Sequence, residues 1–198
     1  MRVIAGTYRS RILKSLKGLE LRPTSDRLRE TLFNVLGAGV AGSRFIDLFA
    51  GTGAMGIEAL SRGADEVVFV ENHAPAAALI RRNLESLGVR TGATVLCMDA
   101  LRGLEKIASG KEEKFSQYDY VFLDPPYAAA NDYARVLESL GSGNLLAPSG
   151  VVIAEHRHSF DLPEARALQR YRVLKQGDAA LSFYRRAAAA AGKNNSAQ

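Results

Sequence analysis

Short apolar runs alternate with helical stretches through the middle of the chain, and this alternation limits the possible folds more than any other feature. The runs expected to be strands are 44–49, 67–70, 93–97, 118–123 and 150–154. Helices are expected over 54–62 and 74–87, where Pro75 suits a first turn and Gly88 a C-terminal cap. Strands that alternate with helices form crossover units, so the sequence predicts an α/β fold with a mostly parallel sheet covered on both faces.

Both ends of the chain depart from this alternation. Short strands are expected at 3–5 and 12–14, forming a hairpin before a helix over 26–36. Runs 171–174 and 180–184 flank a turn-like Gln-Gly-Asp, which predicts an antiparallel C-terminal hairpin. We therefore expect three parts: a basic N-terminal extension over 1–24, one domain over 25–186 and a disordered tail over 187–198.

Composition excludes several classes of protein. The chain has 198 residues, of which 47% are hydrophobic, enough to bury the core of one domain. No apolar run approaches the roughly 20 residues that cross a bilayer, and the start lacks a leader, so a soluble cytoplasmic protein without a membrane partner is expected. The single cysteine, Cys97, excludes an internal disulfide and is expected to be a small core residue.

Positive charge is concentrated at the start of the chain. Residues 1–30 hold eight Lys or Arg and three Asp or Glu, a balance of 8 − 3 = +5, which equals the net charge of the whole chain. Because Lys and Arg gain by displacing counterions from phosphates, this segment suits contact with a polyanion. The alternative is a solvated basic face without a partner.

A glycine-rich loop follows the first long strand. Gly51, Gly53 and Gly56 have the spacing of a dinucleotide fingerprint, and Glu71 lies twenty residues after Gly51 at the end of the next strand. An acid at that position can accept hydrogen bonds from ribose hydroxyls. Taken alone, the loop allows NAD, or a tight turn that binds no ligand.

Three acids at successive strand ends favour a different nucleotide. Asp47 would place negative charge beside the loop that the pyrophosphate of NAD must approach, whereas S-adenosylmethionine carries a sulfonium and an ammonium and has no phosphate. Asp99, after the third strand, is placed to accept from an adenine amino group. Asp47, Glu71 and Asp99 are expected to line one crevice at the carboxyl edge of the sheet, although any one of them alone can simply cap a helix.

Asp124-Pro125-Pro126-Tyr127 ends the fourth strand and suits methyl transfer to a planar nitrogen. The Asp124 carboxylate can accept one N–H of an exocyclic amine and the Pro125 carbonyl the other, which leaves the nitrogen lone pair facing the sulfonium. The prolines stiffen this corner, and Tyr127 can stack on the base. A target base must then be single-stranded or flipped out.

These motifs together resemble the S-adenosylmethionine-dependent amino-methyltransferases. With Arg2-Val3-Ile4-Ala5-Gly6 and the stretch from Leu21-Arg22-Pro23-Thr24 to Phe33, the chain from residue 2 to about 186 resembles the bacterial family that methylates N2 of a guanine in 16S ribosomal RNA. The resemblance implies a Rossmann-like class I methyltransferase fold, with a mostly parallel seven-stranded sheet, an antiparallel C-terminal hairpin and a small basic N-terminal extension.

Three sets of functional residues are expected from these motifs and from the resemblance. Catalysis is assigned to Asp124, Pro125, Pro126 and Tyr127. Binding of S-adenosylmethionine is assigned to Thr24, Asp47, Phe49, Ala50, Gly51, Gly53, Glu71, Asn72, Asp99 and Ala100. RNA contacts are assigned to Arg2, Arg9, Arg11, Lys14 and Arg22, and the resemblance implies that residues 22–24 fold over the cofactor cleft. The expected partner is ribosomal RNA, free or within the small subunit, bound by a monomer without a metal.

The sequence is also compatible with other functions. The same cofactor site would serve an enzyme acting on adenine N6 or on a protein glutamine, although glutamine enzymes usually carry Asn at position 124. An RNA-binding module that has lost catalysis is the non-enzyme alternative. The choice of guanine over adenine rests on the resemblance alone. His156 and His158 lack the further ligands of a metal shell and are expected to form a polar strand end facing RNA or solvent.

Overall fold

A computed structural model describes residues 1–15, 25–110, 117–126 and 130–187. The helices are α1 (Asp26–Leu36), the short 3-10 helix η1 (Gly37–Val40), α2 (Ala54–Ser61), α3 (Ala74–Ser86), α4 (Ala100–Ala108) and α5 (Ala130–Ser142). The strands are β1 (Arg44–Leu48), β2 (Glu66–Val70), β3 (Ala93–Leu96), β4 (Tyr118–Leu123), β5 (Leu146–Arg157), β6 (Leu168–Gln176) and β7 (Ala179–Arg186).

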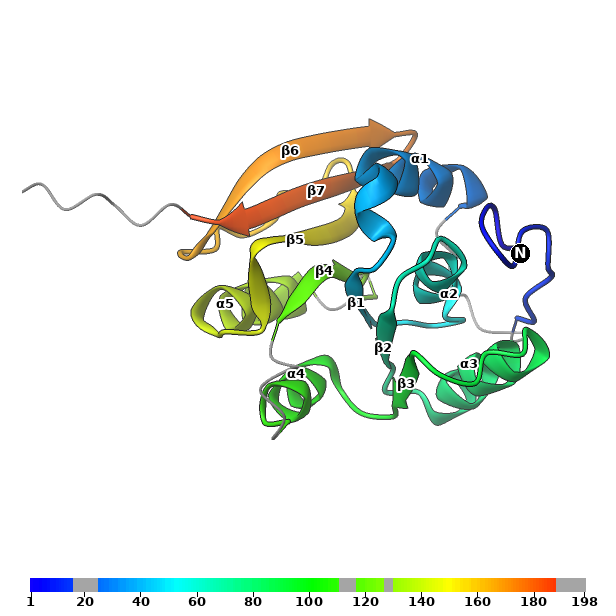
Figure 1. The fold of residues 1–198 in the computed structure, drawn as a ribbon. Coiled ribbons are helices and arrows are strands. Elements are labelled where there is room, and N and C mark those ends of the chain that lie inside the picture. Colours follow the sequence, from blue (N-terminus) through cyan, green and yellow to red (C-terminus); the bar gives the residue numbers. More distant parts are fainter. Residues whose placement is uncertain (16–24, 111–116, 127–129, 188–198) are drawn as a thin grey trace, which may run out of the picture.

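The strands form one seven-stranded sheet in the order β3-β2-β1-β4-β5-β7-β6 (Figure 1). Neighbouring strands from β3 to β5 are parallel, while β7 runs antiparallel to both β5 and β6. The expected seven-stranded, mostly parallel sheet with a C-terminal hairpin is therefore confirmed. All five expected parallel strands are present, and β5 is longer than the apolar run 150–154.

Apolar side chains cover both faces of the sheet. Alternate residues of a strand point to opposite faces, and in β1 Phe45 joins one buried cluster while Ile46 joins the other. The first cluster contains residues of α1, α2 and α3, and the second contains residues of α4 and α5. This double burial explains why the parallel strands are almost continuously apolar instead of alternating with polar residues.

Helices α4 and α5 lie outside the elements expected from the sequence. In α5, Tyr133, Val136, Leu137 and Leu140 are buried at the spacing of one helix face. That spacing is a signal from which the helix could have been predicted. For α1 the expectation is confirmed, and the Ser25 hydroxyl caps it by accepting from the Leu28 amide at 3.1 Å.

The N-terminal residues pair less regularly than the expected hairpin. Only an isolated bridge joins Arg2 to Ile12 within residues 1–15, which we call the N-terminal segment. The reason is that the amides of Ile4 and Ala5 donate to the Glu58 carboxylate of α2, at 2.8 and 3.1 Å, instead of to a strand partner. Gly6 fits because any Cβ there would overlap the Ser61 carbonyl.

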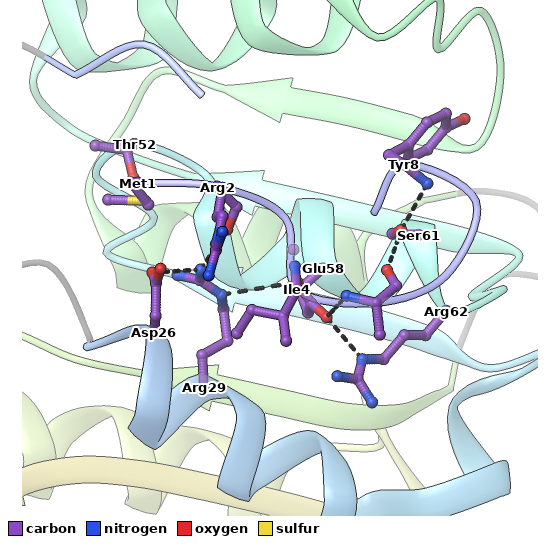
Figure 2. A network of polar contacts seen from close by, with 12 residues as sticks. Met1, Arg2, Ile4, Tyr8, Asp26, Arg29, Thr52, Glu58, Ser61 and Arg62 are labelled. Carbon is purple, nitrogen blue, oxygen red and sulfur yellow. Dashed lines mark hydrogen bonds and ion pairs between the residues drawn. The ribbon is translucent and has the colours of Figure 1, made fainter. Parts of the chain in front are cut away.

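A buried polar network fixes this segment to the domain (Figure 2). Glu58 is fully buried and accepts from Arg62 Nε at 2.7 Å, and its other oxygen lies 3.8 Å from Arg29 Nε. Arg29, on α1, also donates to the Arg2 carbonyl at 2.7 Å and to Asp26 at 2.9 Å. The N-terminal segment is thus packed against α1 and α2.

Two sequence expectations about buried residues are wrong. Cys97 is exposed, because it follows the last residue of β3, the strand at the open edge of the sheet. His156 is buried instead of facing solvent: its ring nitrogens lie 2.9 Å from the Ser182 hydroxyl and 2.7 Å from the Arg157 carbonyl. Pairing of β5 with β7 covers it, a long-range contact that the local sequence does not reveal.

Candidate active site

Strand register brings the predicted site motifs to one edge of the sheet. Leu48, the last residue of β1, pairs with Val70 of β2 on one side and with Leu123 of β4 on the other. Phe49, Glu71 and Asp124 are the residues that follow, so they leave the sheet at the same edge. Ligands of open α/β sheets bind at this carboxyl edge.

The glycine loop turns sharply between β1 and α2. Phe49 has a φ of 60°, which is uncommon for a residue with a side chain, and Gly51 and Gly53 have φ of 54° and 78°. The Gly53 amide donates to the Ala50 carbonyl at 2.7 Å, which tightens the turn. Backbone outliers of this kind are concentrated at ligand sites, and this one lies on the predicted cofactor loop.

Asp47 lies beneath the loop. Its side chain is buried, with 1% of the residue exposed, and one carboxylate oxygen accepts the Gly56 amide at 2.9 Å. Burial raises the pKa of Asp47 to about 8; the Gly56 hydrogen bond lowers that pKa, and the nearby Glu71 charge raises it. In this structure the carboxyl stabilises the start of α2, and its raised pKa disfavours the negative charge that the sequence analysis expected beside the loop.

Glu71 holds the loop from the side of β2. Its two carboxylate oxygens accept the Gly51 amide at 2.7 Å and the His73 amide at 2.8 Å. The residue is almost fully buried. These contacts orient Glu71 at the predicted ribose position. Because a carboxylate has further acceptor positions, Glu71 can still accept hydrogen bonds from a ligand.

A cavity of about 470 Å³ opens beside the loop. Its wall includes four residues predicted to bind the cofactor, namely Phe49, Asn72, Asp99 and Ala100. Asp99 also caps α4, accepting the Arg102 amide at 3.1 Å, and remains half exposed. Side chains that the sequence reading did not assign complete the wall: Val70, Met98, Leu101, Arg102, Glu105, Asp132, Arg135 and Val136.

The fourth-strand motif begins directly after β4. Asp124 is partly buried, Pro125 is buried and Pro126 is exposed, so the corner lies at the surface of the carboxyl edge. Tyr127, Thr24 and Arg22, together with the proposed closure of residues 22–24, lie outside the described residues. The structure thus brings Asp124 and Pro125 to the edge that holds the glycine loop.

The predicted RNA contacts within the described residues all lie on the N-terminal segment. Arg2, Arg9, Arg11 and Lys14 occupy it, and Arg11 also donates to the Ser86 carbonyl of α3 at 3.0 Å. In the parts of the chain that the structure describes, no three His, Cys, Asp or Glu residues are grouped to hold a metal ion. No helix among these residues is long and apolar enough to cross a membrane.

The fold is that of Rossmann-like methyltransferases. A solved hypothetical protein of Thermus thermophilus is 29% identical and superposes with a TM-score of 0.77, over 92% of this chain and 98% of that chain. The 16S rRNA N2 G1207 methyltransferase of Thermus thermophilus, solved with AdoMet and guanosine, gives a TM-score of 0.60 over 87% of this chain and 45% of that one. At 22% identity, the second likeness shows the fold alone.

The chain belongs to the family described as Conserved hypothetical protein 95, whose model matches residues 1–185. A relative from Haemophilus influenzae, named Ribosomal RNA small subunit methyltransferase D, is 36% identical over 78% of each chain. The Escherichia coli K12 protein of the same name is 33% identical over 95% of this chain and 91% of its own. The family is therefore one of S-adenosylmethionine-dependent rRNA methyltransferases.

Proposed function

We propose that this protein transfers the methyl group of S-adenosylmethionine to the exocyclic N2 of a guanine in 16S ribosomal RNA. The observation that carries the proposal is the shared register of β1, β2 and β4, which places the glycine loop, Glu71 and Asp124 at one edge. The relatives named for small-subunit rRNA support the choice of RNA.

The cavity beside the loop fits the nucleoside part of the cofactor. Its wall combines apolar side chains such as Phe49 and Met98 with the polar Asn72 and Asp99, a mixture that suits a purine ring bearing an amino group. Glu71 is oriented by two backbone amides to accept from ribose hydroxyls. S-adenosylmethionine supplies an electrophilic methyl group on a sulfonium when it is bound.

The Asp124 corner activates the nitrogen. The lone pair of an exocyclic amine is conjugated into the base ring, which makes the nitrogen planar and a poor nucleophile. It becomes a better nucleophile when its two hydrogens are held so that the nitrogen approaches tetrahedral geometry. Asp124 accepts one N–H and the Pro125 carbonyl accepts the other, which orients the lone pair toward the methyl group. Holding the two reactants in line supplies much of the acceleration. The proton leaves after transfer, to Asp124 or to water.

The N-terminal segment binds the RNA backbone around the target. Arg2, Arg9, Arg11 and Lys14 contact phosphates, while the base enters the Asp124 corner unpaired or flipped out. Arg22 and Tyr127 belong to the same proposal, as an RNA contact and as the stacking surface for the base.

The reaction product tests the proposal directly. The protein is incubated with methyl-labelled S-adenosylmethionine and one of four substrates: naked 16S rRNA, small ribosomal subunits, DNA or protein. The labelled substrate is then digested to nucleosides or amino acids. Labelled N2-methylguanosine is expected from rRNA or subunits; N6-methyladenosine, methylglutamine or an absence of transfer contradicts the proposal.

A further inference from the structure

Asn83 is a fully buried polar residue of α3 that contacts two functional segments at once. Its carboxamide oxygen accepts the Lys14 amide at 3.0 Å. Its nitrogen donates to the Lys14 carbonyl and to the Thr52 carbonyl, both at 3.2 Å. Lys14 belongs to the N-terminal segment, and Thr52 lies between the two left-handed glycines of the cofactor loop. One side chain thus joins the predicted RNA contact to the cofactor loop.

Only a carboxamide satisfies all three contacts in this position. Two of them need a donor directed at a carbonyl, and the third needs an acceptor. An aspartate would direct a carboxylate at two carbonyl oxygens, and a leucine of similar volume would leave three backbone groups, among them the buried contact at Thr52, without this partner. The loop is held at two neighbouring residues, by Glu71 at Gly51 and by Asn83 at Thr52.

A second connection runs through α2, which starts immediately after the loop. Glu58 of this helix accepts the amides of Ile4 and Ala5, at 2.8 and 3.1 Å (Figure 2). The N-terminal segment is therefore bonded to the loop at Thr52 and to the helix that the loop begins. Displacing the segment changes the surroundings of the loop at both points.

We infer that Asn83 is a positioning residue that couples RNA binding by the N-terminal segment to S-adenosylmethionine binding by the glycine loop. This inference rests on the proposed function. Fixing the segment on RNA fixes the Thr52 carbonyl through Asn83, so each ligand increases affinity for the other. Such coupling is reciprocal: the factor by which RNA tightens cofactor binding equals the factor by which cofactor tightens RNA binding.

The test measures that factor in the full chain. The Kd for S-adenosylmethionine is determined with and without saturating 16S rRNA, and the Kd for rRNA with and without cofactor. In the unmodified protein we expect a coupling factor of about fivefold or more from both measurements. In Asn83→Leu the factor should fall to near one. A loss of stability does not move this ratio of affinities as long as the variant stays fully folded without ligand.

A matched pair of variants at Lys14 tests the same contact without changing any residue of α3. Lys14→Pro removes the amide that donates to Asn83, whereas Lys14→Ala keeps the amide and removes only the charge. Lys14→Pro should lower the coupling factor well below that of Lys14→Ala. Thermal unfolding identifies the folded variants to be compared.

The possible results separate this inference from the proposed function. No coupling in the unmodified protein, or an unchanged factor in both Asn83→Leu and Lys14→Pro, overturns the inference while methyl transfer to guanine stands. Weaker cofactor binding with the same coupling factor shows a purely structural role for Asn83 and also overturns it. Absence of guanine methylation contradicts the proposed function instead.

Discussion

At the scale of single residues, Asp47 is an acid whose ionisation the fold opposes. Its pKa rises from 3.8 in the unfolded reference to about 8, mainly because burial removes the charge from water. A raised acid pKa means that the protonated form stabilises the fold. This contribution is complete below pH 4 and is lost as the pH rises toward 8.

Asp47→Asn should therefore flatten the dependence of stability on pH. The amide oxygen can still accept from Gly56, but it has no proton to lose. Thermal unfolding of both proteins between pH 4 and 9 measures the effect: the difference in Tm should increase with pH in favour of the variant. Parallel curves would show that Asp47 ionises without cost.

Asp124 belongs to the same scale, and its variant separates chemistry from cofactor binding. Asp124→Ala should lower the rate of methyl transfer by about 10²-fold, because the target nitrogen is no longer positioned. Its Kd for S-adenosylmethionine should stay close to that of the unmodified protein. Single-turnover transfer and equilibrium binding give the two values; a comparable loss in both contradicts the assigned role.

At the scale of elements, the contact of α2 with β2 depends on one glycine. A Cβ at Gly56 would lie 2.3 Å from a Phe69 ring carbon and 2.8 Å from Val67 Cγ1, so α2 approaches the sheet closely only because Gly56 has no side chain. Close packing of the helix against the strand is also the role of the third glycine in the dinucleotide-binding fingerprint.

Gly56→Ala has two opposing effects, and their sizes decide the sign. Helix propensity would stabilise α2 by up to about 1 kcal/mol, while overpacking costs about 1–3 kcal/mol. Because the nearest atoms belong to a fully buried ring, we expect net destabilisation. Denaturant unfolding provides the free energy, and a stabilised variant would show that the helix can shift outward.

Glu58 connects three elements, and its removal should be costly. Glu58→Ala leaves the buried Arg29 guanidinium with the half-exposed Asp26 as its remaining anion, and the amides of Ile4 and Ala5 without their acceptor. Breaking a buried ion pair in this way costs about 3–5 kcal/mol. Denaturant unfolding should show that loss, while the exposed Glu138→Ala on α5 should stay within about 0.5 kcal/mol. Similar values for both variants contradict the network.

At the scale of the whole molecule, the N-terminal charges form part of a fixed surface. Arg2, Arg9, Arg11 and Lys14 lie on a segment that is bonded to α1, α2 and α3. A basic surface held in place beside the candidate site can position RNA as well as attract it. The division into extension, domain and tail stays a prediction from sequence.

Salt dependence tests that surface. The logarithm of the affinity falls linearly with the logarithm of the salt concentration, and each phosphate contact contributes about 0.7–0.9 to the steepness of that line. Arg9→Gln combined with Arg11→Gln should therefore reduce the slope for rRNA by about 1.5. Lys106→Gln, an exposed cation on α4, is the matched control and should leave it unchanged. An equal slope in the double variant shows that these arginines do not contact the RNA.

The sequence predicted the sheet well because the strands and helices can be located from apolar patterns within a few neighbouring residues. Apolar runs give the strands, and the parallel arrangement then places Phe49, Glu71 and Asp124 at one edge. The same reasoning failed for His156 and Cys97. Whether a strand is central or at the edge depends on pairings between residues far apart in the chain.

What the sequence alone determined is the type of fold and the edge at which the site motifs meet. Both follow from local apolar patterns and from the alternation of strands and helices along the chain. Only the tertiary structure decided what each polar group does there. It buried Asp47 and raised its pKa, and it placed Asn83 between Lys14 and Thr52. Burial and hydrogen-bond partners of this kind come from long-range packing, which no local pattern records.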